Sequence, residues 1–285
     1  MMAKLSEKAM LVNFSVGMWT GSRKDQPTST EVTRSKNADD DAAAVWVKLV
    51  PPSSVKVLQS MGTKARNSHK AMTLPWTDGG CRILPAKRYL AYTKKMRELE
   101  AEYRKEIDTF LSQYTMLVAD APRRLGDMYD ATKLPTVEDL RSRFHWDVQV
   151  FPLPEATDFR IDINDEVNAD AKKEVEESLK RTTAAAMRHV WDKLYTVVEN
   201  MAKTLKDADK TFRDSLVGNI VKICETLPDL NLTDDKELEV MRKDVLKQLA
   251  NAKPEELRDD KNERKETAKK AADILAKMNK VMKGK

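Results

Sequence analysis

The residues best suited to a chemical role lie between positions 64 and 88, in the segment KARNSHKAMTLPWTDGGCRILPAKR. This segment contains six basic residues and one acidic residue, so its net charge is +5, which equals the formal net charge of the whole chain. Its positive charges are not balanced by acids three or four residues away, as they would be on an ordinary solvated helix face. Such a segment is suited to bind an anion. The candidate residues for nucleic-acid or anion binding are Lys64, Arg66, Lys70, Trp76, Arg82, Lys87 and Arg88.

Two interpretations of this basic segment stay open. In the first, it is a solvated face in which Trp76 anchors the chain to the core. In the second, the cations contact nucleic-acid phosphates while Trp76 or His69 stacks on a base. Gly79 and Gly80 fit both interpretations, because glycine lets backbone amides approach a phosphate and also suits a tight turn.

Two other segments have the composition of a ligand site without its spacing. GMWTGSRK, residues 17–24, follows an expected strand as a phosphate-binding loop would, but its glycines are too close together and no Gly-Lys-Ser/Thr ends it. Four acids near the middle of the chain could hold Mg²⁺, but the glycine of a calcium loop is missing and an acid-rich helix start explains the last two. These acids are Asp158, Asp162, Asp165 and Glu166.

No combination of residues in the sequence indicates catalysis. His69, His145 and His189 fall on three different expected elements, without a matching nucleophile, so we interpret them as structural hydrogen-bonding groups. Cys81 and Cys224 have no second cysteine or histidine at metal-ligand spacing. The sequence therefore predicts a protein that is not an enzyme, with no catalytic residue, no metal and no cofactor.

The composition predicts a predominantly α-helical α+β protein. The chain has 285 residues, of which 34% are charged and 41% hydrophobic, and only eight are glycine. Lysine and glutamate at helical spacings with few glycines favour helices over sheets. No apolar run approaches the roughly 20 residues that span a bilayer. We expect a cytoplasmic protein without membrane contact, and the sequence leaves homo-oligomerisation open.

The N-terminal half predicts a small head that contains strands and one long helix. Alternation of apolar residues predicts a strand over residues 12–18, and GSRKDQPTST, residues 21–30, reads as a loop. Residues 38–50 predict a short helix ended by Pro51 and Pro52, with a second helix capped by Ser53 or Ser54. Apolar residues at steps of three or four then predict a long helix from Ala86 to Leu117.

The remaining pattern predicts a short helix, two strands and a helical bundle. Pro122 and Gly126 are expected in a connection, Thr136 as the cap of the short helix, and residues 145–153 and 158–163 as the strands. Beyond Asn164 every pattern is helical, so we divide the chain into a head, 1–165, and a bundle, 166–285. The polar stretch RDDKNERKETAKK, residues 258–270, is expected to project or fray. The methionine stripes are interpreted as core, with an adaptable partner surface as the alternative; they include Met187, Met201, Met241, Met278 and Met282.

Several segments resemble a phage and prophage family of unknown function. They are LVNFSVGMWTGSRKD, MGTKARN, ILPAKRYLAY after the glycine pair, FLSQY and, above all, LRSRFHWDVQVFPL. The resemblance covers the chain up to about residue 155 and extends loosely into the helical half. Members of that family are typically encoded beside a MoxR-type AAA+ ATPase and a cobalt-chelatase-like von Willebrand A protein. The resemblance supplies no catalytic residues.

From the resemblance we expect a phage-encoded, non-enzymatic interaction or adaptor protein in the host cytoplasm, with the MoxR-type ATPase and the von Willebrand A protein as partners. The alternative is a single-stranded DNA-binding or annealing protein that uses the basic segment from Lys64 to Arg88. The absence of a catalytic constellation places a hydrolase or transferase behind both.

Overall fold

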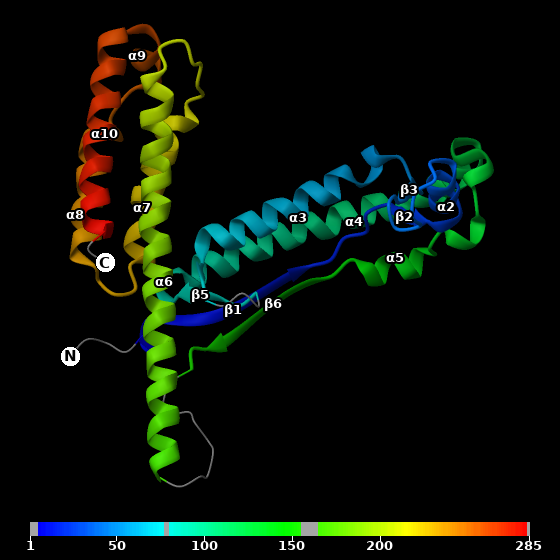
Figure 1. The fold of residues 1–285 in the computed structure, drawn as a ribbon, viewed down its shortest axis with the longest axis horizontal. Coiled ribbons are helices and arrows are strands. Elements are labelled where there is room, and N and C mark those ends of the chain that lie inside the picture. Colours follow the sequence, from blue (N-terminus) through cyan, green and yellow to red (C-terminus); the bar gives the residue numbers. More distant parts are fainter. Residues whose placement is uncertain (1–4, 77–79, 155–164, 284–285) are drawn as a thin grey trace. The chain divides into compact units, whose positions relative to one another are not determined.

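A computed structural model of the chain describes residues 5–76, 80–154 and 165–283, with side chains in the last range from residue 173 onward (Figure 1). It is mainly helical with small antiparallel sheets, so the predicted α+β class is confirmed. The chain forms two compact units. The bundle unit consists of Met1–Val12, Thr73–Tyr89 and Val150–Lys285, and the head unit consists of Asn13–Met72 and Leu90–Gln149.

These units differ from the expected division at residue 165, because the bundle unit also takes up two N-terminal segments. Strand β1 (Ala9–Val16) pairs antiparallel with β5 (Arg82–Pro85), from Ala9↔Pro85 to Val12↔Arg82. Strand β4 (Leu74–Pro75) pairs with the other side of β5, and β6 (Trp146–Pro152) lies beyond β1 in the same sheet. Residues of β1 and β5 are far apart in sequence, but the backbone hydrogen bonds between the two strands place them in the same unit.

The C-terminal part of the bundle unit is a four-helix bundle. Its helices are α6 (Asp165–Lys206), α7 (Ser215–Leu230), α8 (Lys236–Leu249) and α10 (Lys261–Lys283), with the short α9 (Pro254–Asp259) packed on α10. Both α6 and α8 contact α7 and α10, so the four helices close around one core (Figure 1). The predicted periodicity beyond residue 164 is confirmed.

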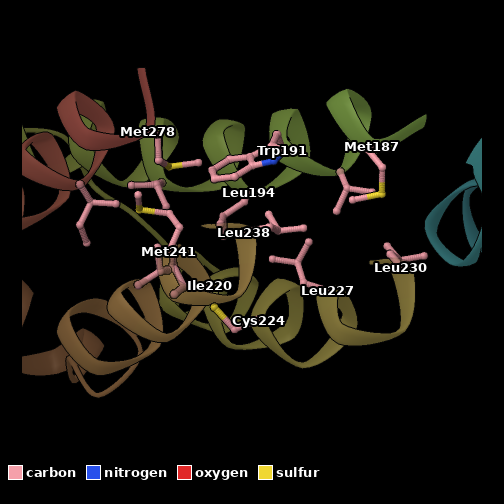
Figure 2. Packing of buried hydrophobic residues seen from close by; sticks show 14 of the residues in the cluster. Met187, Trp191, Leu194, Ile220, Cys224, Leu227, Leu230, Leu238, Met241 and Met278 are labelled. Carbon is pink, nitrogen blue, oxygen red and sulfur yellow. The ribbon is translucent and has the colours of Figure 1, made fainter. Parts of the chain in front are cut away.

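The bundle core contains large apolar side chains from all four helices. Figure 2 shows Trp191 and Leu194 of α6 facing Ile220 and Leu227 of α7, with Leu238 of α8 nearby. Each such side chain contributes roughly 1.5–3 kcal/mol when fully buried. The interpretation of the methionine stripes as core is confirmed for four members, which are at most 7% exposed, and Met282 is half-buried; the four are Met187, Met201, Met241 and Met278.

The turn between α7 and α8 is fixed by hydrogen bonds that converge on Asp235. Its carboxylate accepts hydrogen bonds from the backbone amides of Glu237 and Leu238, so it caps α8. The same carboxylate accepts a hydrogen bond from the indole Nε1 of Trp191 at 3.0 Å. Asn231 bonds the backbone of Asp235 on both its carbonyl and its amide. The cap of α8 is thereby tied to the core of α6.

The expectation that the polar stretch at 258–270 projects or frays is wrong. Helix α10 begins at Lys261, and Arg264 is only 7% exposed. The Arg264 guanidinium donates to the carbonyls of Thr204, Leu205, Asp207 and Lys210, at and just beyond the C-terminus of α6. Its carbon Cζ also lies 5.3 Å from the centre of the Phe212 ring. These carbonyls lack intrahelical partners, which explains why a polar stretch docks here.

The head unit combines two adjacent helices with a small hairpin. Helix α3 (Pro52–Met72) runs beside α4 (Tyr89–Leu125), and α4 buries the predicted stripe from Tyr92 to Tyr114 (Figure 1). The 3₁₀ turn η1 (Ala86–Arg88) precedes α4, and Pro122 lies inside α4 rather than in a connection. The short helix α5 (Val137–Arg143) of the head unit starts at the predicted cap Thr136. The short helix α1 (Leu5–Lys8), which precedes β1, belongs to the bundle unit.

Two further expectations in the head unit are wrong. Residues 21–30 are not a loop, because they form β2 (Ser22–Asp25) and the start of α2 (Gln26–Ser35). Residues 38–50 are not a helix, because Val45–Lys48 form β3, which pairs antiparallel with β2. Asp25 caps α2 through its side chain, and the Val-Trp-Val sequence of β3 suits a strand. The predicted strand at 145–153 is confirmed as β6, whereas that at 158–163 lies outside the described residues. Within the described ranges, every helix is too short or too polar to cross a lipid bilayer.

Replacing Arg264 with methionine should destabilise the protein strongly. The substitution keeps a long side chain but leaves the carbonyls at the end of α6 without their donor, so we expect the free energy of unfolding to fall by about 2–4 kcal/mol. Urea denaturation measures this loss. The neighbouring exposed Lys265→Met should change it by less than about 0.5 kcal/mol. Equal losses for the two variants would contradict the role given to Arg264.

Candidate anion-binding site

The structure distributes the seven predicted binding residues between the two compact units. Lys64, Arg66 and Lys70 lie on α3 in the head unit. The other four, Trp76, Arg82, Lys87 and Arg88, lie in the bundle unit. The basic segment that is continuous in sequence therefore forms two groups of side chains, each with its own surroundings.

Lys64 and Arg66, two of the predicted binding residues on α3, make side-chain contacts inside the head unit. Lys64 Nζ lies 2.7 Å from Glu102 Oε2, and this hydrogen bond, ahead of the charge of Lys64, lowers the pKa of Glu102. Arg66 Nη2 donates to the carbonyl of Val16 at 2.9 Å. Lys70 lies on the exposed face of α3. Two of these cations are thus occupied by contacts within the unit, which favours a structural role for them.

Trp76 and Lys87 have contrasting environments in the bundle unit. Trp76 is half-buried and packs against the hydrophobic core, as expected for a packing anchor. Lys87 is exposed on η1. Hydrophobic contact therefore accounts for the tryptophan without a stacked base.

The remaining two predicted residues, Arg82 and Arg88, form a cationic cluster with Lys193. Arg82 is the first residue of β5, Arg88 ends η1, and Lys193 lies on α6, which packs against β4. Arg82 is held in place by hydrogen bonds from Nε to Thr73 Oγ1 at 2.7 Å and from Nη2 to the Thr73 carbonyl at 3.2 Å. His189 lies one helical turn before Lys193. We call Arg82, Arg88, Lys193 and His189 the cation cluster.

The groups in the cation cluster lower one another's proton affinity. Burial is the largest cause that lowers the pKa of Lys193, to about 8, and the charges of Arg82 and Arg88 add to it. Burial also lowers the pKa of His189, with further contributions from Lys193 and Arg82. Arginine remains charged in proteins, so the repulsion acts mainly on the protonation of the lysine and the histidine. An anion at this position would relieve that repulsion.

Arg88 is the least satisfied member of the cluster. Its side chain is 15% exposed, yet its Nη1 is buried without a hydrogen-bond partner among the described residues. Its Nε lies 4.0 Å from Asp229 Oδ2 of α7, which is the outer limit of an ion pair. A guanidinium with an unused donor is suited to bind one carboxylate or phosphate oxygen. The arrangement can therefore hold one compact anion.

Sequence reasoning found Arg82 and Arg88 but missed Lys193 and His189. Arg82 and Arg88 lie about a hundred positions before His189 and Lys193, and no short motif links the two pairs. One signal was present: His189 and Lys193 are four residues apart and stand among the apolar residues of a strongly periodic helix, which indicates partial burial.

The other candidate sites do not gain support. Residues 17–24 end inside strand β2, whereas a phosphate-binding loop leads directly into a helix. His69 Nδ1 lies 2.8 Å from Tyr92 Oη and His145 Nε2 lies 3.0 Å from Ser15 Oγ, so both make the hydrogen bonds predicted for structural histidines. Asp158 and Asp162, and the side chains of Asp165 and Glu166, lie outside the described residues. Among the described side chains, no group of three or more His, Cys, Asp or Glu could hold a metal ion.

Comparison with known proteins gives one match. Residues 6–218 match a protein family described as "Protein of unknown function (DUF3150)". This range includes all four members of the cation cluster, whereas Asp229, α8 and α10 lie beyond it. No curated protein and no solved structure matches the chain.

Replacing Lys193 with methionine should stabilise the protein at pH 7. Below pH 8 the folded state holds a proton that repulsion and burial disfavour, so removing the charge should raise the free energy of unfolding by about 1–3 kcal/mol. From pH 8 to about 10.5 the unfolded chain binds the Lys193 proton and the folded chain does not, so the stability of the unmodified protein rises with pH and the difference shrinks.

Urea titrations of both proteins between pH 7 and pH 10 measure this difference. Lys180→Met, at an exposed position on the same helix, is the matched control and should show no such pH dependence. A Lys193 variant that is less stable than the unmodified protein at pH 7 would contradict the proposed repulsion.

Proposed function

The chain belongs to the DUF3150 family of proteins of unknown function, and from this premise we propose that it is a non-enzymatic interaction or adaptor protein. The observation that supports this proposal best is the cation cluster. Three cationic side chains from β5, η1 and α6 stand together, half-buried, and Arg88 reaches Asp229 only at the outer limit of ion pairing. The cluster binds one acidic group of a partner protein.

The compactness of the cation cluster favours a protein partner over a nucleic acid. A protein that follows a nucleic-acid strand needs a groove of cations along several phosphates, together with exposed aromatic side chains. The cation cluster is instead confined to one place, and the neighbouring Trp76 packs against the core. A single aspartate, glutamate or terminal carboxylate on a partner surface matches this geometry, because arginine pairs well with planar carboxylates.

The partner we propose is a MoxR-type AAA+ ATPase, with a von Willebrand A protein as a further member of the assembly. The resemblance to a phage and prophage family supports this choice, because its members are typically encoded beside such proteins. In this proposal the bundle unit carries the contact, since it contains the cation cluster. The protein acts by docking and not by chemistry of its own, in the cytoplasm of the host.

The adaptor proposal predicts that the purified protein co-elutes with the neighbouring ATPase, or changes its turnover, in the ATP-bound or the ADP-bound state. Arg88→Gln combined with Lys193→Gln should weaken binding at least tenfold, because the partner's acidic group loses charge-assisted hydrogen bonds. Lys203→Gln combined with Lys243→Gln removes the same charge from exposed positions of the bundle unit and should leave binding unchanged.

Size-exclusion chromatography and ATPase assays measure both effects, with thermal melts to show that each variant folds. No complex and no change in turnover in either nucleotide state would overturn the adaptor proposal. Equal weakening by both pairs of substitutions would remove the cation cluster as its contact.

The second candidate function is single-stranded DNA binding or annealing, and one observation on α3 favours it. Helix α3 contains no acidic residue over its 21 positions. It exposes Lys56, Lys64 and Lys70, although Lys64 is paired with Glu102. A helix face of this kind attracts phosphates through charge alone.

If the second candidate is correct, binding of a 30-nucleotide DNA strand should weaken steeply with salt, with a log–log slope of about 0.7 for each phosphate contacted. Replacing Lys56, Lys64 and Lys70 with glutamine should flatten the slope. Trp76→Ala should lower thermal stability and leave binding unchanged, because the ring packs against the core. Fluorescence anisotropy at several salt concentrations measures the slope, and a slope that the α3 substitutions leave unchanged would exclude this surface.

A further inference from the structure

The last helix of the bundle unit carries a second concentration of positive charge. Helix α10 contains eight basic and three acidic residues, a net charge of +5, which equals the formal charge of the whole chain. The buried side of α10 faces the bundle core, with Ala271, Ile274 and Met278 fully buried. Apart from the buried Arg264, the charge therefore collects on the solvent side of the helix.

Five exposed lysines line up along that solvent side. At 100° per residue they fall within about a 100° arc, and no acid of α10 falls inside it. They extend over 22 residue steps, a length of about 33 Å at 1.5 Å per residue. We call them the lysine stripe: Lys261, Lys265, Lys269, Lys280 and Lys283. The exposed positions between Lys269 and Lys280 on this side are Ala272, Ala276 and Asn279.

Among the described residues, some surface lysines of the bundle unit are paired with acids, whereas those of the lysine stripe are not. Lys203, Lys243 and Lys253 each lie within 3.7 Å of a glutamate on the same helix or helix start, and Lys277 lies 2.9 Å from Asp244. No ion pair joins a lysine of the stripe to another residue that the structure describes. The helix dipole does not explain the stripe either, because Lys261 and Lys265 lie near the N-terminus of α10, where positive charge is unfavourable.

The composition of the lysine stripe indicates what it binds. Protein interfaces are depleted in lysine and rich in aromatic residues and arginine, and the arc contains only lysine, alanine and asparagine. Membrane insertion needs an apolar helix face, and that of α10 is buried in the bundle. Lysines on an exposed helix without aromatic neighbours are typical of contact with phosphates alone.

We propose that the lysine stripe of α10 binds the phosphate backbone of nucleic acid without sequence preference. The length of the stripe is close to the axial rise of about ten base pairs of duplex DNA at 3.4 Å each. Because the stripe has no aromatic side chain for a base to stack on, duplex and single-stranded DNA bind through the same contacts. This surface is separate from the cation cluster and independent of the adaptor function.

Anisotropy with a labelled 30-base-pair duplex and a 30-nucleotide single strand tests this proposal on the full chain. We expect affinity to fall with salt on both, and the fourfold variant Lys265→Gln, Lys269→Gln, Lys280→Gln and Lys283→Gln to weaken binding at least tenfold at low salt. On the duplex it should reduce the log–log slope by about 0.9 for each lysine that contacts a phosphate.

The matched control is a fourfold variant with the same charge loss, made at Lys203, Lys243, Lys247 and Lys253, all exposed in the same unit. It should retain most of the affinity. Equal weakening by the two variants would overturn the proposal. So would the absence of DNA binding near 50 mM salt at micromolar protein, or binding only to vesicles that contain anionic lipid. If the unmodified protein binds DNA but does not co-elute with the ATPase, that result counts against the adaptor function alone.

Discussion

The packing of α6 on two sides is the constraint on which the rest of the bundle unit depends. One side of this helix fills the bundle core with Trp191, Leu194 and Met201, against α7 and α10. On another side it packs against β4, where Ala186 and Val190 are fully buried together with Leu74 and Ile83. Since β4 pairs with β5 and β5 with β1, this contact ties N-terminal segments to the C-terminal helices. It also explains why Lys193, on the amphipathic helix α6, stands beside Arg82 and Arg88.

Polar groups at helix ends then determine how the four helices close. A buried indole N–H requires an acceptor, and Asp235 supplies it while it also caps α8, so the start of α8 is fixed against α6. At the opposite connection, Arg264 satisfies the carbonyls that α6 leaves open. Both solutions use a charged residue near the beginning of one helix to satisfy another helix. Apolar periodicity alone does not determine how the four helices pack. The charged residues at the helix ends determine which ends lie together.

Much of the helical fold could be predicted from sequence because its signal is local. The stripes of α4 and α6 follow directly from spacing, and Thr136 marks a helix start through its capping box. The errors share one cause, since the decisive partner lies elsewhere in the chain. Strand β3 exists because β2 is available to pair with it, and the polar start of α10 docks because α6 ends where it does. For the same reason only part of the cation cluster could be predicted from the sequence. Arg82 and Arg88 are close in sequence, whereas Lys193 is brought to them only by packing.

The cation cluster and the lysine stripe differ in how far their positive charges are exposed to water. Burial, together with the charges of Arg82 and Arg88, lowers the pKa of Lys193, so in our proposal an anion at the cation cluster gains from relief of repulsion as well as from hydrogen bonds. Lysines exposed along α10 carry no such penalty, because water and salt screen them, and an anion there gains only screened attraction. The two proposals therefore differ in the anion they require: we propose a single well-placed acidic group for the cation cluster and an extended polyanion for the lysine stripe. Because the first depends on burial and the second on screened attraction, added salt should weaken binding at the stripe more than binding at the cluster.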